Sequence, residues 1–314
     1  MPPELSDLTS HFVTLTPYQA VGIPIALFGA ILLSLGAQFQ HRGVTRAGTV
    51  AGATTQAGLS IRQVMRLLST PSWVIGTLFL GLAILFQLTS LIFAPLIVVQ
   101  PLGAVALVAT ALINARVSHV KLHRASVRAI VLCVSGVAMF VTIAAFTAHS
   151  NPITETQLVT VLVILAGVLI AFAITFALLR KRFKAIFYIV GAGVLFGFVA
   201  TLAKVVIDRV KTLILLQFKT DNIEWLTIVC VAGLLTAAAL GSYFVQTAYS
   251  NGPPDLVVAG LTVIDPLVAV SIGIIVLGEA ADAPLWAIFA FVVAGAVAIY
   301  GVLLLARNHP QSQH

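Results

Sequence analysis

The stretch that decides the fold is residues 72–116, SWVIGTLFLGLAILFQLTSLIFAPLIVVQPLGAVALVATALINAR, which carries no charged side chain before its last residue. A helix needs roughly 20 apolar residues to cross the hydrocarbon core of a bilayer, so this stretch is long enough for two crossings. Only Phe93-Ala94 separates residues 72–92 from residues 95–116. We therefore expect a tight hairpin of two transmembrane helices.

The composition of the whole chain agrees with a membrane protein. Of its 314 residues, 60% are hydrophobic and 9% are charged, and the mean hydropathy is +1.10. Soluble domains average roughly 45–50% apolar and about 25% charged residues, which excludes a water-soluble enzyme. The two cysteines, Cys133 and Cys230, lie inside apolar runs, so we interpret them as small buried hydrophobes.

The same length criterion predicts an all-α polytopic membrane protein, with residues 1–314 forming a single transmembrane domain. Nine spans are expected, at residues 18–38, 72–92, 95–116, 127–147, 157–179, 186–207, 225–247, 256–277 and 284–306. The longest connection, residues 39–71, is expected to be cytoplasmic. Within it, apolar and basic residues alternate at near-helical spacing, which predicts a short interfacial helix or a partly ordered loop; they are Leu59, Arg62, Met65, Arg66 and Leu68.

Positive charge alternates between the loops. Lys and Arg concentrate in short cytoplasmic loops of membrane proteins. Here the basic clusters follow the first, third, fifth and ninth spans, whereas residues 1–17, 93–94, 148–156 and 278–283 contain no Lys or Arg. The exception is residues 208–224, where Arg209, Lys211 and Lys219 stand against Asp208, Asp221 and Glu224. We expect a multi-pass protein of the plasma membrane, with its N-terminus outside and its C-terminus in the cytoplasm. The basic clusters comprise Arg42, Arg46, Arg62, Arg66, Arg116, Lys121, Arg124, Arg128, Arg180, Lys181, Arg182, Lys184 and Arg307.

Two spans contain matching motifs. Residues 100–105 read QPLGAV and residues 265–270 read DPLVAV, each placing a polar residue and a proline inside an apolar helix. The charge pattern makes these two spans antiparallel. We therefore predict an inverted-topology repeat, with repeat one at 18–147, a linking helix at 157–179 and repeat two at 186–306. Transporters built in this way bind substrate near the bilayer midplane, between the repeats.

At this point the chain resembles the drug/metabolite transporter superfamily. The motif Asp265-Pro266-Leu267 followed by Leu277-Gly278-Glu279 is similar to that of EamA-type members, in which a proline-bearing helix ends in Gly-Glu. The stretch from Ala94 to Ala104 is similar to the NIPA-like magnesium transporters, which also have nine spans. The resemblance covers nearly the whole chain and implies a transport function.

Six residues form the expected substrate site. Asp265 sits near the centre of its span, where a carboxylate is costly unless it is paired, protonated or hydrated. It is either a substrate- or proton-binding group beside Pro266, or a protonated acid that fixes a kink. Gln100, next to Pro101, is its counterpart in repeat one, with interhelical hydrogen bonding as the alternative. Gln87 and Gln246 complete the set, and packing hydrogen bonds are the alternative for both.

Charged and small residues suggest further roles. Lys204 and Asp208 are spaced i, i+4, so Lys204 is expected to extend toward the membrane surface and pair with Asp208 at the outer mouth, or else to sense substrate. Glycines at seven-residue spacing from Gly22 to Gly36, and the pair Gly193 and Gly197, predict close helix packing.

The sequence also constrains chemistry. His119 and His123 have metal-ligand spacing but lack a third ligand, so no metal site is expected. No phosphate-binding loop, nucleophile motif or zinc-protease motif occurs, and we expect neither catalytic activity nor a cofactor.

Three functions remain open at this stage. The first is secondary-active transport of small organic metabolites or drugs by alternating access. The second is transport of Mg²⁺ or another divalent cation, and the third is a non-transporting scaffold or envelope-assembly protein without a polar cavity. Expected partners are membrane lipid and a small-molecule or ion substrate, with a homodimer as an open possibility, and no nucleic acid.

Overall fold

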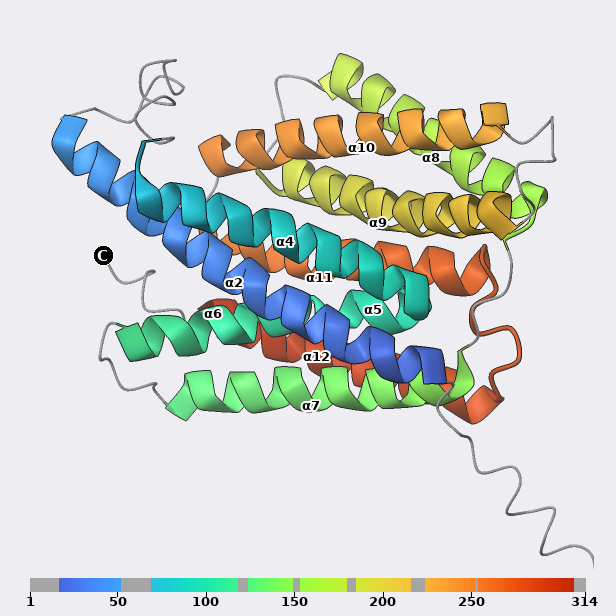
Figure 1. Cartoon of the computed structure of the whole chain (residues 1–314), viewed down its shortest axis with the longest axis horizontal. Helices are drawn as coiled ribbons and strands as arrows, with labels where there is room; N and C mark the ends of the chain where they lie inside the picture. The colour runs from blue at the N-terminus through green and yellow to red at the C-terminus, as the bar shows by residue number, and fades with distance from the viewer. Residues whose placement is uncertain are drawn as a thin grey trace, which may run out of the picture.

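The computed structural model describes residues 17–51, 69–117, 124–148, 153–179, 185–215, 224–251 and 254–307, and every regular element in these ranges is helical (Figure 1). The helices are α2 (Pro17–Ala51), α4 (Pro71–Phe93), α5 (Leu96–Leu102), α6 (Ala104–Val117), α7 (Arg124–Thr147), α8 (Glu155–Leu179), α9 (Ala185–Leu215), α10 (Glu224–Asn251), α11 (Pro254–Ile275) and α12 (Leu285–Arg307).

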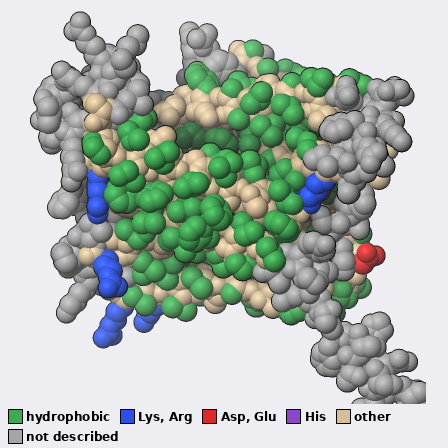
Figure 2. Space-filling view, viewed as in Figure 1, with side chains coloured by type: hydrophobic (Ala, Val, Ile, Leu, Met, Phe, Trp, Pro, Cys, Tyr) green, Lys and Arg blue, Asp and Glu red, His purple; other side chains and the backbone are tan. Residues whose placement is uncertain are grey.

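The predicted all-α membrane architecture is confirmed. Within the described ranges, nine helical segments are long and apolar enough to cross a membrane, and α5 and α6 together form one of them. Their surface is correspondingly apolar, with large hydrophobic side chains covering most of the face in Figure 2. Cys133 and Cys230 are buried, as expected for small hydrophobes.

The predicted hairpin is present and turns sharply. The N–H of Ala94 closes α4 by donating to the carbonyl oxygen of Ser90 at 2.9 Å. Pro95 then caps α5 in an extended conformation, which suits a residue whose ring fixes φ and which has no N–H to place. We call residues 93–96 the elbow, and the end of the bundle at which they lie the elbow end.

The helices run between two ends of the bundle (Figure 1). The described chain starts with α2 at the elbow end, on the right of the view, and finishes with α12 at the opposite end. Helix α2 continues to Ala51, so residues 39–51 of the predicted loop are helical, not a connection. The predicted interfacial segment at 59–68 and the histidines His119 and His123 lie outside the described residues.

Close backbone approach holds the bundle together. In lipid, helices associate through packing and polar contacts because burial of apolar surface gives little advantage there. Helix α2 packs on α4, α9 on α10 and α11, and α7 on α12. A Cβ atom added at Gly22 would lie 2.7 Å from the Cβ of Ala94, and one at Gly197 would lie 2.7 Å from the Cβ of Val268. The predicted glycines therefore serve packing, against the elbow in the first case and α11 in the second.

Candidate functional site

A cavity of about 410 Å³ lies in the middle of the bundle. Its walls come from α2 and α4 on one side, from the junction of α5 and α6, and from α9 and α11 on the other side. Ile84 of α4 lines it and is 60% exposed on the outer surface of the bundle. The cavity therefore reaches the outer surface of the bundle beside α4.

Four predicted site residues meet in this cavity. Gln87 comes from α4, Gln100 from α5, and Asp265 and Pro266 from α11. Gln100 is only 6% exposed, in an otherwise apolar helix. Amide and carboxyl groups from helices far apart in the sequence thus share one chamber. No Lys or Arg occurs among the described residues that line it.

Asp265 is the unusual member of the set. In the part of the chain that the structure describes, its Oδ1 atom is buried and has no hydrogen-bond partner. Buried polar groups in proteins are nearly always paired, and an unpaired one calls for an explanation such as a ligand or water. An acid at this position can bind a cation or a proton.

Prolines weaken the two helices beside the cavity. Pro101 and Pro266 each remove one backbone N–H from a helix interior. Helix α5 ends just after Pro101, and Gly103 forms a tight turn by donating its N–H to the carbonyl oxygen of Gln100 at 3.1 Å before α6 begins. Discontinuous helices of this kind expose backbone groups at transporter substrate sites.

The glycines of α9 bring Asp265 to the cavity. A Cβ at Gly193 would lie 3.4 Å from the backbone nitrogen of Asp265, and one at Gly197 would lie 3.1 Å from its carbonyl oxygen. Larger residues at either position would push α11 away from α9. The spacing of these glycines therefore fixes the depth of the carboxyl group in the bundle.

The remaining predicted substrate residues lie elsewhere. Pro101 lines a separate apolar groove, together with Pro266, on the far side of the α5–α11 contact. Gln246 lies on α10, is exposed, and is not among the residues lining the cavity. Helix α10 packs on the back of α9, which explains why a polar residue of the seventh span does not reach the site.

The predicted ion pair is present, but its surroundings differ from expectation. Nζ of Lys204 lies 3.3 Å from Oδ2 of Asp208. Lys204 was expected to extend toward the membrane surface, yet it is 2% exposed and donates to the carbonyl oxygen of Leu91 at 2.9 Å. Lys211 donates to the carbonyl oxygen of Ile92. The last carbonyls of a helix lack intrahelical partners, so these cations neutralise the end of α4.

Glu279 completes this arrangement from the other side of the elbow. Its carboxylate accepts hydrogen bonds from the N–H groups of Leu96 and Ile97, each at 2.7 Å. These are the first amides of α5, where a negative charge is favoured. Gly278, with φ of 69°, turns the chain after α11 and brings Glu279 there. We call Lys204, Asp208, Lys211 and Glu279 the elbow clamp.

Burial raises the pKa of the Glu279 carboxyl above its ordinary value, while its two N–H bonds and the positive charge of Lys204 oppose the rise. Sequence reasoning quoted Gly278-Glu279 only as part of a family motif and assigned Glu279 no role. The signals that identify it are an acid directly after a glycine at a helix end and an elbow with uncapped amides.

Comparison with known proteins adds one relative. An uncharacterized protein of Corynebacterium glutamicum is 28% identical over 291 residues, which cover 92% of this chain and 95% of that protein. The similarity therefore extends along almost the whole helical bundle. No family model matches the chain, and no solved structure matches it.

Proposed function

We propose that this protein is a secondary-active transporter of a small organic solute and works by alternating access around the central cavity. The observation that carries this proposal is the meeting of Gln100 and Asp265 in one chamber. The two residues come from matched proline motifs in the N-terminal and C-terminal halves. Their convergence is what an inverted-repeat transporter requires at its substrate site.

Packing within the two halves supports the repeat. Helix α2 packs on α4 and on α5–α6, and α9 correspondingly packs on α10 and α11. Helix α7 contacts the α5–α6 segment, as α12 contacts α11. The motif-bearing helices α5 and α11 also touch each other. Superposing the halves after inversion is expected to pair Gln100 with Asp265 and Pro101 with Pro266.

The orientation follows from charge. Arg42, Arg116, Arg124 and Arg128 are exposed on α2, α6 and α7 at the end opposite the elbow. Figure 2 correspondingly shows basic side chains gathered on the left. The preference of basic residues for the cytoplasm makes that end cytoplasmic and the elbow end extracellular. Tags at the two termini are expected on opposite faces of the plasma membrane, and labelling of both from one face would contradict this.

The deciding experiment is flux in proteoliposomes. Purified protein is reconstituted, and uptake of pooled metabolites is compared with uptake of Mg²⁺, with and without a pH gradient. Asp265→Asn keeps the size of the side chain and removes its charge. Loss of flux or of its pH dependence in a folded variant is expected. The matched control is Asp282→Asn, which alters an exposed loop carboxylate. Unchanged, normally pH-dependent flux in Asp265→Asn would overturn the mechanism.

Divalent-cation transport is the second candidate. Carboxyl and amide oxygens from Asp265, Gln87 and Gln100 face one chamber, and Mg²⁺ prefers oxygen ligands and retains several waters. Against this, the described residues contain no group of three or more His, Cys, Asp and Glu side chains that could hold a metal. Saturable Mg²⁺ uptake that depends on Asp265 would favour this candidate. A scaffold has no need of such a cavity.

A further inference from the structure

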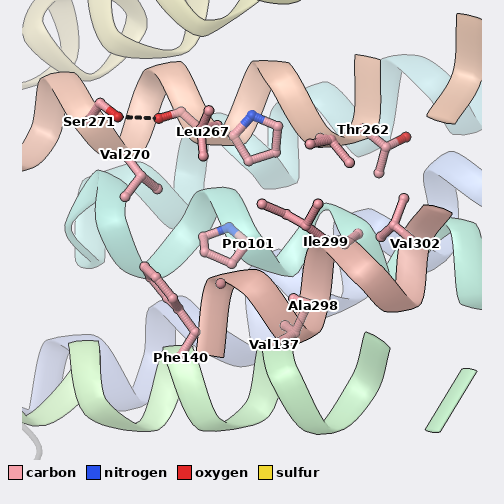
Figure 3. A pocket seen from close by; sticks show the side chains of 14 residues that line it. Pro101, Val137, Phe140, Thr262, Leu267, Val270, Ser271, Ala298, Ile299 and Val302 are labelled. Carbon is pink, nitrogen blue, oxygen red and sulfur yellow. Dashed lines mark hydrogen bonds between the residues drawn. The ribbon is translucent and has the colours of Figure 1, made fainter. Parts of the chain in front are cut away.

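A second compartment adjoins the central cavity. It is an apolar groove of about 130 Å³ between the α5–α6 segment, α7, α11 and α12. Figure 3 shows its side chains converging on one space, with Pro101 and Phe140 on one side and Leu267 and Val270 on the other. The groove is separate from the elbow clamp and contains no charged residue among its described lining.

The polar side chains among the described residues that line the groove, Thr262 and Ser271, are turned toward their own helix. The hydroxyl of Thr262 donates to the carbonyl oxygen of Val258 at 2.8 Å. The hydroxyl of Ser271 donates to the carbonyl oxygen of Leu267 at 2.7 Å, the bond drawn in Figure 3. Both hydroxyl protons are therefore already used. The surface offered to a ligand is mainly hydrocarbon.

The groove and the cavity are neighbours. Ala104, Thr262 and Pro266 line both compartments. The boundary is thus made of small side chains and a proline ring at the α6–α11 contact. Asp265 lies on the cavity side of this boundary, directly before the shared Pro266, and Leu267 follows on the groove side. The acid and the groove therefore lie on the two sides of one boundary, and a ligand that contacts both must extend past Thr262 and Pro266.

The carboxyl group sets the charge of the ligand. Asp265 Oδ1 is buried without a hydrogen-bond partner among the described residues, and no described Lys or Arg lines either compartment. A cationic group is the natural complement of such an acid. The side-chain amides of Gln87 and Gln100 line the same cavity and can both donate and accept hydrogen bonds.

We infer that the transported solute is an organic cation with an alkyl arm: the cationic head binds beside Asp265, and the arm occupies the apolar groove. This inference rests on the proposed transport function and specifies its substrate class. It also explains why the two compartments differ in chemistry yet share a wall.

A homologous series tests the inference by binding alone. Tetramethylammonium and its butyl-, pentyl- and hexyl-trimethylammonium relatives are titrated into the purified full-length protein by calorimetry. Each methylene placed in the groove is expected to lower Kd about fourfold, until the groove is full. An alkanesulfonate of equal length is expected not to bind. Asp265→Asn should weaken the whole series and leave its chain-length dependence intact.

Filling the groove provides the complementary variant. A Cβ at Gly295 meets only the ring of Phe140, at 3.9 Å, so a larger side chain there has room to enter the groove. Gly295→Leu is expected to abolish the chain-length dependence while leaving tetramethylammonium binding unchanged. Gly295→Ala, which the same contact accommodates readily, should show a partial effect if the leucine variant does not fold. Gly167→Leu is the matched control, because nothing lies within 4 Å of a Cβ at that position.

The outcomes separate the two proposals. Equal affinity along the series, as expected for a groove already filled by lipid, overturns the inference. Equal chain-length dependence in Gly295→Leu also overturns it. If the series does not bind but another solute is carried in an Asp265-dependent manner, the inference fails and the transport function stands. If the series binds with the expected dependence but no member is carried, the binding site stands and the transport function fails.

Discussion

Two carboxyl groups inside this bundle have opposite surroundings, Glu279 being buried and Asp265 half-buried. Glu279, at the elbow, receives an N–H bond on each oxygen and lies near the positive charge of Lys204. Asp265, in the central cavity, has a buried oxygen without a partner among the described residues. A carboxylate that the protein satisfies stabilises structure. A carboxylate that lacks protein partners can still form bonds with a ligand. Substitution of Glu279 should therefore lower stability, whereas substitution of Asp265 should lower ligand binding and leave stability unchanged or higher.

The largest loss of stability is expected for Glu279→Ala. The substitution leaves two buried amides of α5 without acceptors and removes a negative charge near Lys204. Breaking a buried charged network of this kind costs about 3–5 kcal/mol. The melting temperature in detergent measures the effect. Glu155→Gln is the control, because Glu155 is 67% exposed where it approaches Arg209 at 3.7 Å. A melting temperature equal to that of the wild type would show that the clamp is not structural.

Lys204→Met should have the next largest effect. Methionine retains most of the length of the side chain but cannot donate to the carbonyl oxygen of Leu91 or pair with Asp208. Loss of hydrogen bonds made by a buried charge costs about 2–3 kcal/mol. Lys211→Met is expected to cost less because Lys211 is 41% exposed. Equal melting temperatures for the two variants would show that the greater burial of Lys204 does not increase its contribution to stability.

Gly22→Val probes the packing that supports the elbow. A Cβ at Gly22 would lie 2.7 Å from the Cβ of Ala94, so α2 must move outward. Overpacking of this kind costs about 1–2 kcal/mol. The control is Gly81→Val on α4, where nothing lies within 4 Å. Chemical unfolding of both variants in detergent measures the difference, and equal stabilities would contradict the close α2–α4 contact.

Asp265→Asn should have the smallest effect on stability. Because the carboxyl group has an unpaired buried oxygen, removing its charge relieves a desolvation cost, and the melting temperature is expected to stay constant or rise. Binding and flux should nevertheless fall. A loss of stability comparable to that of Glu279→Ala would mean that Asp265 is a structural acid and would remove the contrast between the two sites.

The spans and the hairpin were predictable because hydropathy and proline act locally along the chain. The Lys204–Asp208 pair was predictable for the same reason, being one helical turn apart. The direction of Lys204 was not, since its acceptor at Leu91 lies 113 residues away in the sequence. The cavity was partly predictable, because matched motifs marked Gln100 and Asp265. The exposure of Gln246 and the role of Glu279 depend on which helices face each other, and no short motif encodes that.

The capping of α5 by Glu279 has a consequence for biogenesis. During synthesis, Leu96 enters the membrane 183 residues ahead of the acid that will satisfy its amide. The amides of Leu96 and Ile97 therefore lack their acceptor until α11 and the turn at Gly278 have been synthesised and inserted. A nascent chain arrested before that point is expected to be a target for quality-control proteolysis. Completion of the last helices is then expected to make the chain resistant to such proteolysis.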